Sequence, residues 1–275
     1  MVVQKGSSRW LAPSRSKRWA EIFFLAYSPL WMIWCLAIVV PFKIYERCDE
    51  LGYMIIGLGC FLPCVLLPLL IPGKADQDKP YAQRYWVKAT VWIAIYSFIG
   101  NYFWTHYFYQ LLGAAYTFPS WRLNDVPIPL YLMTHAYFCF YHALANVVIR
   151  RVKHAAKASG PLQQKLWTAL TVFLLAYATA YMETLTIAHF PHYNFKDKAR
   201  MYSLGSLFYA IYFFVSFPWF LQMDESPVQR WSVGRAATDS LAAGMLVTIL
   251  LDAWRLGIGA IMDGGGKPQG LPWMS

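Results

Sequence analysis

Seven apolar stretches, each about long enough to cross a bilayer, constrain this chain of 275 residues more than any other feature. A transmembrane helix needs roughly 17–25 mainly apolar residues, and the loops between the stretches are too short to fold as a soluble domain. The predicted spans are residues 22–40, 51–72, 86–109, 128–149, 166–190, 203–221 and 236–262. The sequence therefore predicts an all-α polytopic integral membrane bundle of about seven transmembrane helices. It forms a single transmembrane domain over residues 1–275, with a basic segment 1–20, a bundle 22–262 and a short tail 263–275.

Composition agrees with a bilayer as the main partner. Hydrophobic residues make up 58% of the chain and charged residues 14%, against about 25% charged residues in soluble proteins. The net charge of +10 could suggest nucleic-acid binding. The lysines and arginines, however, sit in loops between apolar runs and do not form one basic face. We expect a lipid bilayer and no nucleic acid as partner.

The distribution of basic residues predicts the orientation in the membrane. Sixteen of the 24 lysines and arginines fall on the side of the N-terminus, and seven fall on the opposite side. Cytoplasmic loops carry the excess of Lys and Arg, so we expect the N-terminus in the cytoplasm. The first apolar run is as long as a membrane span, which favours an uncleaved helix over a signal peptide.

Cysteines and histidines give no linear pattern for a cofactor or metal. Four of the five cysteines lie inside apolar runs, and Cys60 and Cys64 are one helical turn apart, as small apolar residues on a helix face often are. The six histidines form no box of the kind that membrane hydroxylases and desaturases carry. No phosphate-binding loop or nucleophile elbow is present either. We predict no disulfide, no metal and no cofactor.

Ionisable and polar residues inside predicted spans are the candidates for function, because such groups are costly in a bilayer. Counting about 1.5 Å per helical residue, Asn101, His135, Glu183 and Asp252 share one layer in the outer half of the membrane. Their convergence predicts a buried active site, and an inter-helix hydrogen-bond network is the alternative. Arg255 lies three residues after Asp252, on the same helix face, so the two are expected to form an ion pair.

This polar layer suggests acid–base chemistry on an apolar substrate. Glu183 has no Lys or Arg within one helical turn, and a carboxyl in apolar surroundings can stay protonated near neutral pH. Glu183 is therefore the candidate acid, whereas Arg255 would hold Asp252 ionised. His106 or His135 could act as the base. Aromatic faces stabilise a developing positive charge, so Tyr102, Trp104, Tyr107 and Tyr181 are candidate substrate-binding residues. The polar side chains of Asn101 and Arg255 are further candidates.

Several longer motifs resemble the cycloeucalenol cycloisomerase family. They are GNYFWTHYF at residues 100–108, YTFPSW at 116–121, RYWVKA at 84–89, LFYAIYF at 207–213 and MLVTI at 245–249. The likeness runs in order from SKRW at 16–19 to GLPW at 270–273 and so covers nearly the whole chain. The basic loop 150–165 and the glycines 264–266 differ from the family pattern, and both lie outside the polar layer.

The resemblance implies a cofactor-independent enzyme of sterol biosynthesis in the endoplasmic reticulum membrane. The implied substrate is cycloeucalenol, a 9β,19-cyclopropyl sterol, and the implied product is obtusifoliol. An acid would protonate the cyclopropane methylene carbon, and a base would remove the C8 proton. Two alternatives stay open: a sterol double-bond isomerase similar to the emopamil-binding protein family, and a non-catalytic sterol-binding or transport protein. The family pattern assigns neither acid nor base.

Overall fold

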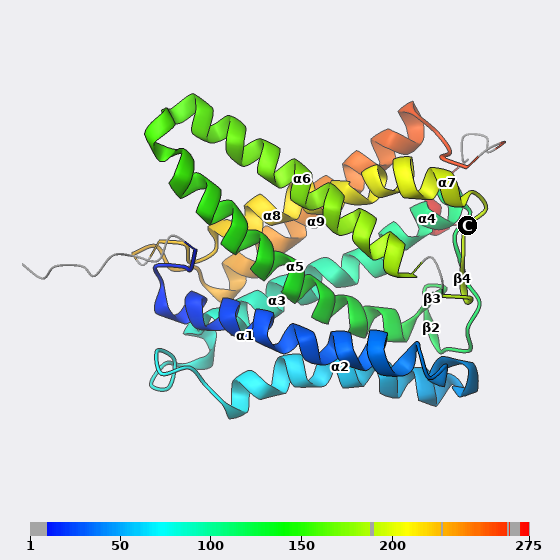
Figure 1. Ribbon diagram of the computed structural model, residues 1–275, viewed down its shortest axis with the longest axis horizontal. Helices are drawn as coiled ribbons and strands as arrows, with labels where there is room; N and C mark the ends of the chain where they lie inside the picture. The colour runs from blue at the N-terminus through cyan, green and yellow to red at the C-terminus, as the bar shows by residue number, and fades with distance from the viewer. Residues whose placement is uncertain (1–9, 188–189, 227, 263, 265–269, 275) are drawn as a thin grey trace, which may run out of the picture.

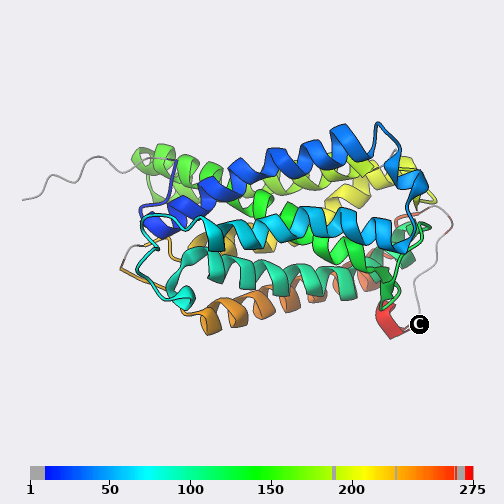
Figure 2. The same cartoon turned by 90° about the horizontal axis from the view of Figure 1, so that it is seen from below.

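The computed structural model describes residues 10–187, 190–226, 228–262, 264 and 270–274. Long helices run side by side along the longest axis of the molecule (Figures 1 and 2). Residues 1–9 of the basic segment and most of the tail 263–275 lie outside the described residues. The predicted all-α membrane bundle is confirmed.

The predicted spans correspond to helical runs, some of which contain π-helical turns. The runs are α1 (Arg15–Met32) with η1 (Ile33–Val39), α2 (Glu50–Leu70), α3 (Tyr85–Ile99) with η4 (Gly100–Trp104) and α4 (Thr105–Leu112), α5 (Ile128–Ala155), α6 (Pro161–Ile187), α7 (Lys198–Arg200) with η6 (Met201–Gly205) and α8 (Ser206–Gln222), and α9 (Val233–Gly257). Short 3-10 turns lie at η2 (Ile44–Arg47), η3 (Tyr81–Gln83), η5 (Ala156–Ser159) and η7 (Pro272–Met274).

Six of these runs, within the described residues, are long and apolar enough to cross a membrane. The exception is the run α3–η4–α4, whose many tyrosines and tryptophans, together with Asn101 and His106, lower its hydropathy. It nevertheless extends from one end of the bundle to the other beside the other helices (Figures 1 and 2).

The helix ends follow local capping chemistry. Asp49 accepts a hydrogen bond from the backbone of Gly52 at 2.8 Å and so caps α2, and Ser232 does the same for α9. Helix α4 stops at Gly113, whose φ of +60° is a left-handed conformation that glycine adopts without strain. A side chain at this position would also collide with Lys196.

Several predicted boundaries differ from the structure. The stretch 150–165, expected to be a loop, is almost entirely helical, with one tight turn through η5 and Gly160. Its Lys, Arg, Ala and Gln residues are good helix formers, so α5 and α6 continue beyond the apolar runs. The sixth run begins at Lys198, earlier than the predicted residue 203, and α9 ends at Gly257, earlier than the predicted 262.

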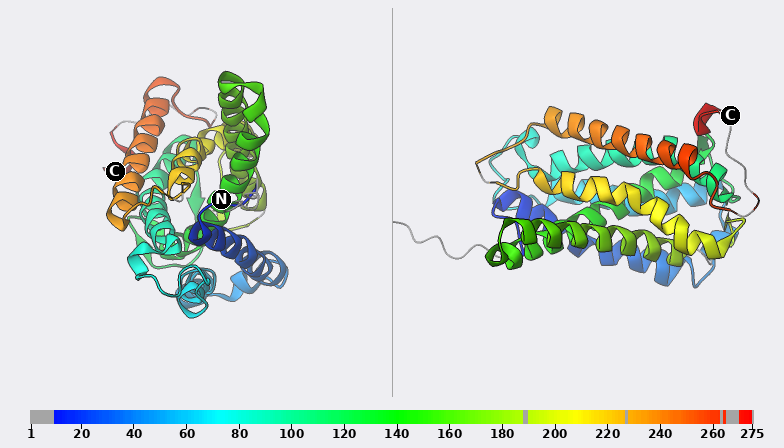
Figure 3. Two further views of the ribbon diagram at one scale, coloured as in Figure 1. Left: turned by 90° about the vertical axis from the view of Figure 1, so that its left-hand side faces the viewer. Right: turned by 90° about the horizontal axis from the view of Figure 1, so that it is seen from above.

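The end-on view shows how the helices are layered (left panel of Figure 3). The most extensive helix pairings are α6 with α8, α3 with α9, and α2 with α5. In the α3–α9 pairing, the side chain of Ser240 donates to the carbonyl of Trp92 at 2.7 Å, and Gly244 leaves room for Ile99. Among the spans, α8 has the largest buried share, which fits a central position.

Four very short strands cover the end of the bundle that carries the C-terminus (Figure 1). β1 (Ala115–Tyr116) pairs antiparallel with β4 (Tyr193–Asn194), and β2 (Arg122–Leu123) pairs with β3 (Val126–Pro127). The β1–β4 pair joins two loops that are far apart in the sequence. It therefore fixes how the connection before α5 lies against the connection after α6.

A buried ionic network occupies the opposite end, near the start of α1. Arg150 contacts Glu21 at 2.7 Å and Glu225 at 2.6 Å, and Lys17 contacts Glu225 at 2.8 Å. Lys88 forms a further buried ion pair with Asp224. Lys17, Lys88 and Arg150 lie on the predicted cytoplasmic side, and acidic partners from distant segments hold their side chains inside the protein.

Candidate active site

A cavity lies between α5, α6, α8 and the π-helical turn η4, next to the β1–β4 pair. Its walls are mainly aromatic and hydroxyl-bearing side chains. They are Gly100, Asn101, Thr105, Phe108, Tyr116, Thr134, Phe138, Glu183, Thr184, Ile187, Tyr193, Met201, Tyr209 and Tyr212. Among the described residues of this lining, Glu183 is the one carboxyl, and none is a lysine, an arginine or a histidine.

Glu183 presents its carboxyl to this cavity from α6. Its Oε2 atom is shielded from solvent and has no hydrogen-bond partner among the described residues. The hydroxyl groups of Tyr141 and Tyr209 lie close enough to the Glu183 carboxyl to interact with it, both by charge and by hydrogen bonding. The neighbouring Thr184 is satisfied within its own helix, because its hydroxyl donates to Ala180 at 2.9 Å. Within the described lining, the Oε2 atom of Glu183 is thus the buried side-chain polar atom that lacks a hydrogen-bond partner.

Two π-helical turns border the cavity, η4 through Gly100 and Asn101 and η6 through Met201. Such turns are frequent at functional sites, because they displace side chains from the regular helical face. The side-chain amide of Asn101 donates to the carbonyl of Ser97 at 2.9 Å. Asn101 is 7% exposed and lies in the same cavity as Glu183.

A pair of stacked tyrosines closes the cavity at the β1–β4 end. The rings of Tyr116 and Tyr193 lie 4.2 Å apart at an angle of 7°, and these two residues are register partners in the small sheet. A hydrogen bond of 2.9 Å from the backbone of Thr117 to His192 holds the same two loops together. The free volume of the cavity is about 80 Å³, below the roughly 300–1,000 Å³ of typical ligand sites.

The four residues of the predicted polar layer do not share one site. Asn101 and Glu183 line the cavity together, whereas His135 and Asp252 do not line it. Asp252 pairs with Arg255 at 2.7 Å, as the sequence predicts, and accepts a hydrogen bond from Tyr107 at 3.2 Å. Its contacts are therefore with charged and phenolic groups near the end of α9.

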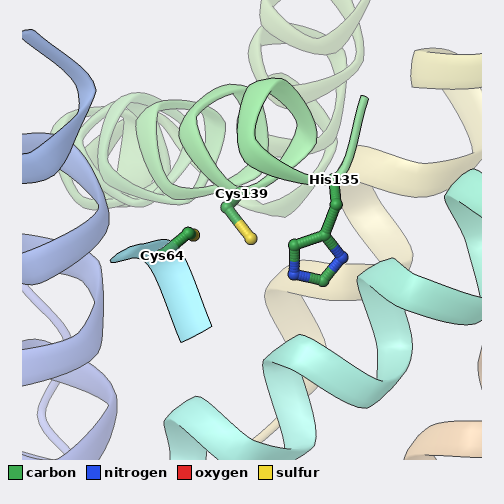
Figure 4. Close-up of side chains that lie close together, drawn as sticks. All are labelled: Cys64, His135 and Cys139. Atoms are coloured by element: carbon green, nitrogen blue, oxygen red, sulfur yellow. The ribbon is translucent and has the colours of Figure 1, made fainter. Parts of the chain in front are cut away.

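The two histidines considered as base also lie outside the cavity lining. His106 holds the backbone carbonyl of Asn124 at 2.9 Å through its Nε2 atom and packs edge-on against Tyr109. His135 points toward two cysteines, Cys64 and Cys139 (Figure 4). Residues at one depth in the membrane need not meet, because depth does not fix the direction in which a side chain leaves its helix.

The predicted aromatic contacts are also placed elsewhere. Trp104 is fully buried and donates to Thr248 at 2.8 Å, while Tyr102 stacks on Phe98 at 5.5 Å. Tyr181 is 37% exposed and lies near Tyr177 and Tyr202. The aromatic side chains that do line the cavity include Tyr116, Tyr193, Tyr209 and Tyr212, and sequence reasoning did not select them.

Comparison with known proteins identifies the family. No protein-family model matches the chain, and no solved structure matches it. The cycloeucalenol cycloisomerase of Arabidopsis thaliana is 49% identical over 279 residues, an alignment that covers all of both chains. The chain belongs to the cycloeucalenol cycloisomerase family.

Membership in the cycloeucalenol cycloisomerase family makes the chain an isomerase of sterol biosynthesis, embedded in a membrane through several helices. The motifs that carried the resemblance also contribute to the cavity. YTFPSW supplies Tyr116, LFYAIYF supplies Tyr209 and Tyr212, and GNYFWTHYF supplies Asn101. These motifs were the available signal for the missed residues, although hydropathy alone gave no reason to choose them.

Proposed function

We propose that this isomerase opens the 9β,19-cyclopropane ring of cycloeucalenol to give obtusifoliol, in the endoplasmic reticulum membrane and with Glu183 as the acid. The observation that carries the proposal is the carboxyl of Glu183, whose Oε2 atom has no hydrogen-bond partner among the described residues and whose aromatic cavity has no cationic side chain in its described lining. Such surroundings favour the neutral carboxylic acid. A carboxylic acid is a stronger proton donor than a tyrosine hydroxyl, and carbon is a poor base, so this donor suits the reaction.

The first step is protonation of the cyclopropane methylene carbon, C19. The electrons of the C9–C19 bond form the new C–H bond, so C19 becomes a methyl group and positive charge develops at C9. Aromatic faces attract a cation, and the cavity offers the rings of Phe108, Tyr116 and Tyr212. Glu183 has become a carboxylate at this stage, and its negative charge also stabilises the cation.

The second step is removal of the proton at C8, and we assign it to the same carboxyl. The part of the lining that the structure describes holds no histidine and no second carboxyl, so the Glu183 carboxylate is the strongest base among these residues. When it takes the C8 proton, the C8–C9 double bond forms and the neutral acid is restored. His106 and His135 are not required for this cycle, which consumes no cofactor and changes no oxidation state.

Binding of a sterol requires the cavity to widen. Its present free volume of about 80 Å³ is too small for a rigid tetracyclic substrate. The stacked pair Tyr116–Tyr193 lies on short loops between helices, where local opening costs less than movement of a buried helix. We propose that separation of these two rings admits the sterol skeleton.

Product analysis tests the proposed reaction. The full chain, expressed in sterol-deficient yeast fed cycloeucalenol, should yield obtusifoliol, identified by gas chromatography with mass spectrometry because substrate and product have equal mass. A migrated double bond in a fed sterol without a cyclopropane ring would instead indicate a double-bond isomerase. Recovery of bound but unchanged cycloeucalenol would indicate a binding or transport protein.

The orientation in the membrane is a separate proposal with its own prediction. The basic end of the bundle, which includes Ser159 in η5, should face the cytoplasm, and the β-strand end, which includes Ser120, should face the lumen. An engineered N-glycosylation acceptor site at Ser120 should therefore be modified, and one at Ser159 should not. The reverse pattern would overturn the orientation.

A further inference from the structure

Three side chains that bind soft metals come together between α2 and α5, outside the Glu183 cavity. They are Cys64, His135 and Cys139, and their ligand atoms all lie within 4.8 Å of one another. Figure 4 shows both sulfurs and the imidazole directed into one space between the helices. Each residue is at most 2% exposed. The cluster is therefore enclosed by protein and shielded from the lipid.

The cluster forms only in the folded chain, and no sequence motif predicts it. His135 and Cys139 are four residues apart on α5, a spacing that places both side chains on one helix face. Cys64 reaches the same point from α2, which packs closely along α5. Spacing within single stretches predicts no metal site, whereas these ligands come from two spans.

The imidazole of His135 lacks the hydrogen bond that a buried ring nitrogen normally makes. Its Nε2 atom has no hydrogen-bond partner among the described residues, and the edge of Phe61 packs against the ring at 5.1 Å. In Figure 4 one ring nitrogen lies on the side of the two sulfurs. A buried polar atom without a partner costs roughly 1–3 kcal/mol, and a metal ion bound at this nitrogen would remove that cost.

We propose that Cys64, His135 and Cys139 bind one zinc ion. Two thiolates and a neutral imidazole match the Cys₂His set found in zinc sites, which leaves a fourth position for a water molecule. Charge favours a divalent ion, because two thiolates neutralise Zn²⁺ and the filled site carries no net charge inside the membrane. On binding, each thiol loses a proton to the solvent and forms a zinc–sulfur bond.

The zinc ion joins α2 to α5 and fixes the rotation of α5. Thr134 and Phe138 immediately precede His135 and Cys139, and both line the cavity that contains Glu183. A change in the rotation of α5 at the ligands would move this wall of the cavity. The zinc thus has a positioning role, and it takes no part in the proton transfers of the proposed reaction.

A second pair of cysteines in the same region provides a matched control. Cys35 and Cys60 have their sulfurs 3.5 Å apart and are buried like the proposed ligands. They belong to no cluster of three metal-binding side chains in the described part of the chain. Replacement of Cys35 by alanine removes a buried sulfur of the same size without touching the proposed ligands.

The full-length protein is purified in detergent, without chelators, from cells grown with zinc. Its zinc content is then measured by inductively coupled plasma mass spectrometry. We expect about one zinc per chain in the wild type and in Cys35→Ala, and at least tenfold less in Cys64→Ala. X-ray absorption should show sulfur at about 2.3 Å and nitrogen at about 2.0–2.1 Å from zinc. His135→Cys preserves three soft ligands and should retain the ion, which separates loss of a ligand from loss of folding.

Several outcomes would overturn the proposal. Wild-type protein with far less than one zinc per chain would show that the cluster holds thiols and an imidazole only. Equal zinc contents in Cys64→Ala and Cys35→Ala would place any bound zinc elsewhere. Stoichiometric copper with a sulfur-containing shell would keep the site but replace the ion that we assign to it.

Discussion

Replacement of Glu183 by glutamine should lower turnover of the cyclopropyl sterol by at least about 10²-fold, the usual scale for loss of general acid catalysis. Glutamine has nearly the size of glutamate and can form hydrogen bonds, but it cannot deliver a proton to carbon. Because Glu183 makes no ion pair among the described residues, the variant should fold and still bind sterol. The measurement is turnover by purified enzyme, with sterol binding determined on the same preparation.

Asp239→Asn is the matched control, since Asp239 is another carboxyl on a membrane helix. It lies outside the cavity and accepts a hydrogen bond of 2.8 Å from Trp92, which asparagine can also accept. Its turnover should stay close to that of the wild type. Near-normal turnover by Glu183→Gln would move the acid to another group and leave Glu183 with a packing role.

An isotopic label distinguishes one carboxyl from two catalytic groups in the same reaction. If Glu183 takes the C8 proton and later donates it, deuterium placed at C8 should appear in part in the new methyl group of subsequent product molecules. A separate base would leave no deuterium there. This readout concerns the route of the proton, so a merely structural effect of a substitution cannot imitate it.

The sequence predicts the spans well because hydropathy is a local property. A helix in a bilayer must satisfy its own backbone hydrogen bonds, so each apolar stretch of sufficient length indicates one helix without knowledge of its neighbours. Glu183 could be selected as a candidate acid for the same reason: its lack of a nearby cation is visible in adjacent residues. The boundary errors arose where helices α5 and α6 continue past the apolar region.

What the sequence left open depends on helix rotation and on contacts between distant segments. His135 and Glu183 share a depth, but His135 faces Cys64 and Cys139 while Glu183 faces the tyrosine-lined cavity. Tyr116 and Tyr193 meet only because two loops pair across 77 positions of sequence. The buried ion pairs of basic residues at helix ends could not be predicted either, because their acidic partners lie in other segments.

Replacement of Arg150 by methionine should destabilise the protein more than any single change at the cavity. Arg150 bonds to both carboxyl oxygens of Glu21 and of Glu225, so its loss leaves two carboxylates without their main partner. Removal of one member of a buried ion pair costs about 3–5 kcal/mol. The expected result is a large fall in the melting temperature of the detergent-solubilised enzyme and in the yield of folded protein.

Arg151→Met is the control for this effect, because it removes the same charge from the adjacent position. Arg151 lies over the ring of Trp10 at 5.4 Å and is only partly buried, so its replacement should change the melting temperature little. A comparable fall in both variants would mean that charge at this end of the bundle matters in general. The specific network around Arg150 would then not be the cause.

The same network predicts how stability responds to pH. Burial on its own raises the pKa of Glu225, but hydrogen bonds from Arg150 and the charge of Lys17 outweigh burial and lower this pKa to about 2. The unfolded chain titrates near 4.5, so the folded form binds the proton less readily. The stabilisation is therefore present above about pH 4.5 and is lost as the pH falls toward 2. Arg150→Met should reduce this acid-dependent fall in melting temperature, since without the arginine the Glu225 carboxyl titrates nearer to its unfolded value. An unchanged pH profile in that variant would show that Arg150 does not hold Glu225 in its ionised form.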